Sequence, residues 1–118
     1  MEKVNGIGGV FFRAKDPKAL SDWYETHLGV KHYDPVPWKQ REGATVFAPF
    51  AQDTDYFGRA DQQWMINFRV DDLGAMIAQL ENAGITVETR PEWDSAVGKF
   101  ARIHDPEGNP VELWEPNQ

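Results

Sequence analysis

The clearest alternation of apolar and polar positions lies near the end of the sequence, where two such runs flank the segment DPEGN at residues 105–109. The residue types of this segment favour a turn, because proline presets φ, glycine frees it, and aspartate and asparagine bond to local backbone. Alternation with a period of two is typical of strands, so the pattern predicts a β-hairpin. In its outgoing strand Glu112 and Trp114 share one face, opposite Val111 and Leu113.

The first half of the chain predicts a strand, a helix and several short strands. Residues 4–14 are mostly apolar and include β-branched and aromatic residues, which favours a strand. Asp16 and Pro17 then have the residue types of a helix N-cap and first turn, apolar residues follow at helical spacing, and Gly29 is a natural stop. Short strands are predicted after this helix at residues 30–33, 38–41 and 44–47.

The pattern then begins again after residues 51–63, which have no sustained period and are predicted to be a linker. Residues 10–16 match residues 66–72 at an offset of 56. The identical pairs at this offset are Phe12/Phe68, Arg13/Arg69, Asp16/Asp72, Ala19/Ala75 and Glu25/Glu81.

The second copy predicts the same order of elements as the first. A helix is expected from the cap Asp72 to Gly84, followed by a strand at residues 85–89 and then the closing hairpin. The sequence therefore predicts one domain over its 118 residues, made of two β-α-β-β-β modules at about residues 4–50 and 64–116.

Strand alternation also predicts which side chains point away from the core. One helix per module must cover the apolar face of its sheet. The opposite face then carries Phe11 and Arg13 in the first copy, and Met65, Asn67 and Arg69 in the second. Such residues either contact solvent or line a cavity, and alternation alone leaves both alternatives open.

Composition excludes several classes of function. The net charge is −7, from 12 basic and 19 acidic residues, and no dense patch of Lys and Arg is visible, so nucleic acid is not an expected partner. The chain has no cysteine, which excludes disulfides, thiolate metal sites and cysteine nucleophiles. No apolar span or signal-like segment is present, so a cytoplasmic protein without a membrane partner is expected.

Taken in order, these motifs resemble the glyoxalase / bleomycin-resistance / extradiol-dioxygenase superfamily, the vicinal oxygen chelate (VOC) fold. The resemblance covers about residues 4 to 116 and rests on residues 10–16, Trp23-Tyr24 with Leu28-Gly29, Val70-Asp71-Asp72 with Ala83-Gly84, and DPEGN followed by Val111-Glu112-Leu113. It implies an α+β fold in which curled mixed sheets of two modules form a cup for a small molecule. It also implies a homodimer.

The resemblance implies that the strand faces opposite the predicted helices form a candidate ligand site. Arg102 lies across the hairpin from Glu112, where the two charges can satisfy each other or leave Arg102 to hold a ligand anion. The candidate ligand-binding residues are Glu112, Arg102, Asn67, Arg69, Met65, Phe11, Arg13 and Trp114.

Members of the superfamily usually hold a divalent metal with His or Gln from each first strand and Glu from a last strand. The matching positions here are Gly9, Met65 and Glu112, so Glu112 is the only matching ligand and no metal cofactor is predicted. The sequence leaves open whether a non-standard site is built by His27, His32 or His104.

Three functions remain as hypotheses. The favoured one is a metal-free protein that binds a small anionic or aromatic molecule, as antibiotic-sequestering relatives do. The second is an enzyme of the superfamily, either a glyoxalase-like lyase or isomerase or a ring-cleaving dioxygenase. In the third, the chain's own side chains fill the cup and the chain associates with a partner protein.

Overall fold

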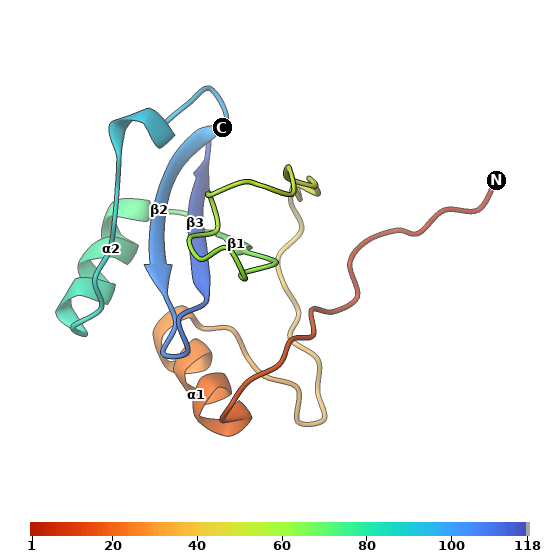
Figure 1. Ribbon diagram of the computed structural model, residues 1–118. Helices are drawn as coiled ribbons and strands as arrows, with labels where there is room; N and C mark the ends of the chain where they lie inside the picture. Colours follow the sequence, from red (N-terminus) through yellow and green to blue (C-terminus); the bar gives the residue numbers. More distant parts are fainter. Residues whose placement is uncertain (118) are drawn as a thin grey trace.

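The computed structural model describes residues 1–117 and shows an α+β fold, as predicted (Figure 1). Its three strands form a mixed sheet of order β1-β3-β2, in which β1 runs parallel and β2 antiparallel to β3. No helix in this part of the chain is long and apolar enough to cross a membrane. The elements in chain order are α1 (Pro17–Leu28), β1 (Ile66–Arg69), α2 (Leu73–Asn82), the 3-10 turn η1 (Pro91–Trp93), β2 (Gly98–His104) and β3 (Pro110–Pro116).

Both helices begin where the sequence predicts. The side chain of Asp16 accepts a hydrogen bond from a backbone N–H in the first turn of α1, and Asp72 does the same for α2. Helix α1 ends at Gly29, whose φ of 70° is in the left-handed region that glycine tolerates. Helix α2 ends slightly before the predicted stop, since Ala83 is its C-cap and Gly84 follows with φ 81°.

The predicted C-terminal hairpin is confirmed. Strands β2 and β3 pair along their full length, and Asp105 organises the turn between them. Its carboxylate accepts hydrogen bonds from the backbone N–H groups of Glu107 and Asn109 at 2.9 and 3.0 Å, and from the Asn109 side chain at 2.8 Å. This turn also reaches helix α1, because Tyr24 Oη donates to Asp105 at 2.6 Å.

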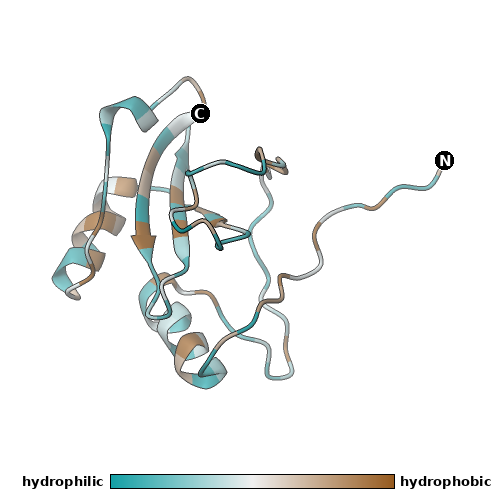
Figure 2. Ribbon diagram, in the orientation of Figure 1, coloured by the Kyte–Doolittle hydropathy of each residue, from teal (hydrophilic) through white to brown (hydrophobic). Residues whose placement is uncertain are grey.

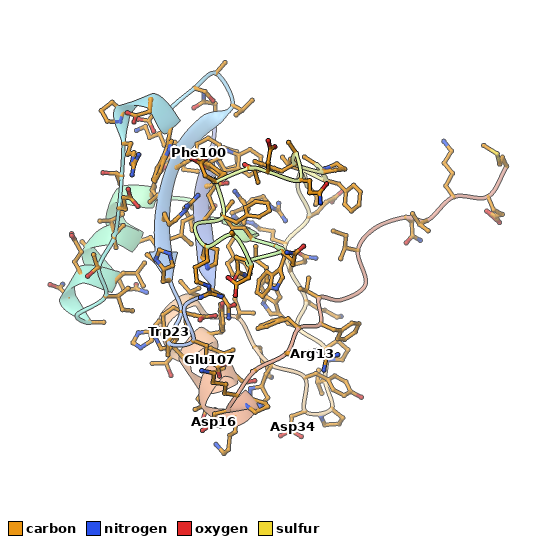
Figure 3. The ribbon with its side chains drawn as sticks, viewed as in Figure 1. Arg13, Asp16, Trp23, Asp34, Phe100 and Glu107 are labelled. Carbon is orange, nitrogen blue, oxygen red and sulfur yellow. The ribbon has the colours of Figure 1, made fainter. Side chains whose placement is uncertain are left out.

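Helix α1 is held against the hairpin by a second contact. The carboxylate of Glu107 accepts hydrogen bonds from the backbone N–H groups of Lys15 and Asp16, at 2.7 and 3.0 Å, and Figure 3 shows Glu107 close to the start of the helix. A carboxylate there also complements the positive end of the helix dipole. The apolar core lies where the two helices meet one face of the sheet, and consists of Leu20, Tyr24, Leu73, Leu80, Ala101, Ile103, Val111 and Leu113.

The strands predicted for the first module are absent from the described residues 1–117. Residues 4–14, 30–33, 38–41 and 44–47 have no strand pairing, and in Figure 1 the N-terminal segment runs away from the sheet. Residues 85–89 keep only one bridge to β2. Alternation predicts extended chain, but a strand also needs a neighbour for its backbone hydrogen bonds. The prediction of strands in these segments is therefore wrong for a single chain.

These unpaired segments include apolar residues, coloured brown in Figure 2, and several of their side chains are exposed. Val4 and Phe11 are 93% and 95% exposed, and Phe47 is 86% exposed. A soluble protein normally covers apolar surface of this extent. The first half of the chain thus presents apolar surface that its own second half does not cover.

Candidate functional site

A cluster of polar and aromatic side chains lies on the sheet face opposite the helices. It is centred on Arg102 of β2 and Glu112 of β3, which are directly opposed in the antiparallel pairing and each only 9% exposed. We call it the Arg102–Glu112 cluster, and its other members are Asn67, Tyr56 and Trp93. Burial of two charged groups is costly unless each finds partners, so their contacts indicate what the cluster can do.

Both carboxylate oxygens of Glu112 accept hydrogen bonds from neutral donors. Asn67 Nδ2 donates to Oε1 at 2.7 Å, and Tyr56 Oη donates to Oε2. Asn67 reaches Glu112 because β1 is parallel to β3 with these two residues in register. The carboxylate is therefore fixed in orientation by one residue from the sheet and one from a loop.

Tyr56 comes from residues 51–63, which fold as consecutive reverse turns rather than as a plain linker. Backbone bonds close these turns from Thr54 to Ala51, from Gly58 to Asp55 and from Gln62 to Arg59. Burial, and then the hydrogen bond to Glu112, raise the pKa of Tyr56 to about 12. Its hydroxyl therefore stays protonated and donates a hydrogen bond to Glu112 throughout the physiological range.

Arg102 makes aromatic contacts but few polar ones. The guanidinium carbon lies 4.5 Å from the centroid of the Tyr56 ring and 5.5 Å from that of Trp93, within the range of cation–π attraction. Its Nε and Nη2 atoms are buried without a hydrogen-bond partner. Among the described residues no ion pair joins Arg102 to Glu112. The two opposed charges thus do not satisfy each other.

Further aromatic and charged residues surround the cluster. Phe50 stacks on the Tyr56 ring at 5.6 Å, and Arg90 lies 5.3 Å from the centroid of the Trp93 ring. Arg90 is itself exposed and forms an ion pair with Glu88 at 2.6 Å. The cluster is therefore bordered by aromatic rings, while the neighbouring cation has its own partner.

A groove of about 800 Å³ lies between residues 84–89 and the His104 end of β2. Trp23 of α1 also lines this groove, and Figure 3 shows Phe100 at the opposite end of β2. Of the predicted site residues, Arg102 alone borders it. The groove is lined by Trp23, Gly84, Ile85, Thr86, Val87, Glu88, Thr89, Arg102, His104, Asp105 and Pro106.

The remaining predicted site residues lie outside the cluster. Arg69 donates to the backbone carbonyl of Arg41 at 2.8 Å, and Trp114 stacks on Phe100 while its Nε1 donates to the Val97 carbonyl at 2.9 Å. Three others have no polar contact with the cluster: Met65, which is half-buried, and Phe11 and Arg13, which are exposed. In Figure 3 Arg13 lies among the coil segments, well apart from Phe100.

Sequence reasoning missed Tyr56 and Trp93. Both lie in segments without strand or helix periodicity, and one of them was predicted to be only a linker. The signal that could have found them is a large aromatic side chain within an otherwise polar loop. Such loops on a rigid scaffold often carry binding residues.

The structure also places the residues at the superfamily's metal positions. No group of three or more His, Asp or Glu side chains within residues 1–117 is arranged to hold a metal ion. Gly9 has no side chain, and the thioether of Met65 is a soft ligand that suits neither Mg²⁺ nor Mn²⁺. Glu112, the third position, already accepts two hydrogen bonds. These residues do not fit the metal site that the resemblance implies.

Comparison with known proteins agrees with the motifs. A family model described as a glyoxalase-like domain matches residues 9–114. The crystal structure of TnmS3, an antibiotic binding protein from Streptomyces sp. CB03234, is 21% identical, with a TM-score of 0.65 over 99% of this chain and all of that one. A structure from the mobile metagenome of V. Pseudocholerae is 20% identical, with a TM-score of 0.65 over all of this chain and 99% of that one. No curated protein matches the chain.

Proposed function

Because this chain belongs to the glyoxalase-like domain family, we propose that it binds a small organic molecule against the Arg102–Glu112 cluster and does so without a divalent metal. The observation that carries the proposal is the state of Glu112. Both of its carboxylate oxygens accept bonds from neutral donors, Tyr56 and Asn67. A carboxylate held in this way is a fixed polar group in the wall of an organic-ligand site.

The ligand chemistry follows from the walls of the site. Small-molecule pockets combine aromatic surface with a few well-placed polar groups. Here the aromatic surface is supplied by Phe50, Tyr56 and Trp93, and the polar groups are Arg102 and Glu112. An aromatic molecule that carries polar or anionic substituents matches both. The description of the Streptomyces structure as an antibiotic binding protein adds antibiotics to the molecules worth screening.

We further propose that a second copy of the chain completes the cup. The support is the unpaired first half, in which Phe11 and Phe47 are exposed and residues 4–14 and 44–47 are extended without a partner strand. A homodimer is the commonest symmetric assembly and would cover this surface. In that dimer the segments predicted as strands gain the neighbours that the single chain does not offer.

A screen of aromatic acids and aromatic antibiotics by intrinsic fluorescence tests binding, because the indole of Trp93 lies in the cluster. Ligands are expected to quench the wild type and to quench the Trp93→Phe variant much less. Trp38→Phe is the matched control, since Trp38 lies outside the cluster and is 41% exposed. If every molecule leaves the fluorescence unchanged, or if both variants lose the same signal, the proposed site is wrong.

Elemental analysis of the purified protein separates binding from the metal-dependent alternative. Well below one ion of zinc, manganese or iron per chain is expected, because the residues at the metal positions offer a single carboxylate. A stoichiometric metal that is lost in Glu112→Gln would contradict the proposal and favour a lyase or dioxygenase. Glu107→Gln is the control, as this carboxylate binds backbone N–H groups elsewhere.

A further inference from the structure

The two unpartnered nitrogens of Arg102 are not an arbitrary pair. In a planar guanidinium, Nε–H and one N–H of Nη2 lie on the same edge and point in parallel directions. This edge is the one that grips two oxygens of a single anion at once. Nε and Nη2 are the two atoms of Arg102 that are buried without a partner. The whole side-on fork of the residue is therefore unused within the described chain.

The surroundings of the fork explain why it stays unused. Glu112 is the nearest opposed carboxylate in the strand pairing, but Tyr56 and Asn67 hold both of its oxygens. The rings of Tyr56 and Trp93 lie within cation–π range of the guanidinium, and its Nε and Nη2 atoms are buried from water. Unmade hydrogen bonds of a buried cation are costly, so a partner that fills both donors at once gains more than it would from water.

We propose that this fork is the anchor for a carboxylate on the ligand, an inference that rests on the proposed function and names the ligand class. The two carboxylate oxygens accept from Nε and Nη2 of Arg102, in the plane of the guanidinium. The aromatic part of the same molecule then packs against Tyr56 and Trp93. The ligand is thus an aromatic acid, and Arg102 rather than Glu112 selects it.

The charge of the cluster favours a carboxylate over a phosphate. Arg102 brings one positive charge, and the carboxylate of Glu112 lies on the neighbouring strand. A monoanion balances Arg102, whereas a phosphate monoester with nearly two negative charges is repelled more strongly by Glu112 at short range. Both anions can bind a fork in bidentate fashion, so the difference between them is measurable.

Tyr56 keeps Glu112 from occupying the fork. Its ring covers the guanidinium, and its hydroxyl ties the loop of residues 51–63 to Glu112. Tyr56→Phe keeps the ring but frees Oε2 of Glu112 to pair with Arg102, so it is expected to lower the affinity for an aromatic acid.

The experiment is a calorimetric titration of the 118-residue chain with benzoate, benzamide and phenyl phosphate. Benzoate is expected to bind at least tenfold more tightly than benzamide, which has the same ring without the charge, and more tightly than phenyl phosphate. Arg102→Lys keeps the charge but loses the fork, so its benzoate affinity should fall at least tenfold. Arg90→Lys is the matched control, because Arg90 is exposed and paired with Glu88, and a change below twofold is expected.

Equal binding of benzoate and benzamide, or equal losses in the two lysine variants, would overturn the inference, and tighter binding of phenyl phosphate would assign the fork to phosphate esters. If Arg102→Lys does not fold, the Arg102 Nε–H resonance of the wild type decides, because benzoate must shift it if the fork is the anchor. A neutral molecule from the fluorescence screen that binds Arg102→Lys normally would sink this inference and leave the proposed function intact. If no molecule binds at all, both fall.

Discussion

Replacing the two central charges by leucine, one at a time, should have unequal consequences for stability. In Glu112→Leu, Tyr56 loses its acceptor and the buried guanidinium of Arg102 is left without a nearby negative charge. A buried cation with no negative charge nearby, together with a hydroxyl that has lost its acceptor, should cost about 3–5 kcal/mol, the range for removing one member of a buried charge pair. Asn67 is exposed and can turn to water, so it adds little to that cost.

Arg102→Leu should cost much less. Glu112 keeps both of its hydrogen bonds, and the change removes two donors that had no partner. What is lost is chiefly the cation–π attraction to two rings, about 0.5–1 kcal/mol for each ring. We therefore expect a net destabilisation of about 1–2 kcal/mol, roughly 2 kcal/mol less than for Glu112→Leu.

Urea unfolding at neutral pH measures this difference directly. With a slope of about 1.5 kcal/mol per molar urea, the two midpoints should be separated by roughly 1.3 M. The double variant Arg102→Leu with Glu112→Leu should be more stable than Glu112→Leu alone, because no uncompensated charge remains. Equal costs for the two single variants would mean that the charges do satisfy each other. A larger cost for Arg102→Leu would refute the contacts described for Glu112.

Three further predictions test the parts that position the site. Asp105→Ala should destabilise the protein by about 3 kcal/mol, because Tyr24 Oη loses its buried acceptor, and combining it with Tyr24→Phe should add little in a double-mutant cycle read by urea unfolding. The pKa of Tyr56 is raised from 10.0 to about 12, so its contribution to stability is complete below pH 10 and disappears as the pH rises to about 12; Tyr56→Phe should make unfolding less sensitive to alkali over that window. Light scattering at micromolar concentration should give twice the mass of one chain, and a strict monomer would contradict the proposed dimer.

The two helices and the C-terminal hairpin could be predicted because their signals are local. Asp16 and Asp72 cap their own helices, and DPEGN closes its own turn through Asp105. The hairpin register follows from the short turn, so the sequence pattern alone could predict that Arg102 and Glu112 lie opposite each other. Each of these features depends on residues within a few positions of one another.

The strands predicted for the first half could not be assigned in the same way. Its alternating segments have the residue types of strands, and residues 10–16 even repeat residues 66–72. The repeat shows that both segments favour extended chain, but only Ile66–Arg69 lies beside β3 and becomes a strand. Whether an extended segment joins a sheet depends on the partner available, which sequence periodicity does not specify.

The Arg102–Glu112 cluster shows the same limit at the level of side chains. Strand parity predicts that both charges share a face, and the simplest inference from that is an ion pair. In the structure Glu112 instead accepts a hydrogen bond from Tyr56, a residue 56 positions away in a loop without periodicity. That third residue changes the chemistry, because it occupies the acceptor that Arg102 would otherwise use. The free fork of Arg102, and with it the expected preference for an aromatic acid, is a consequence of where one loop tyrosine lies.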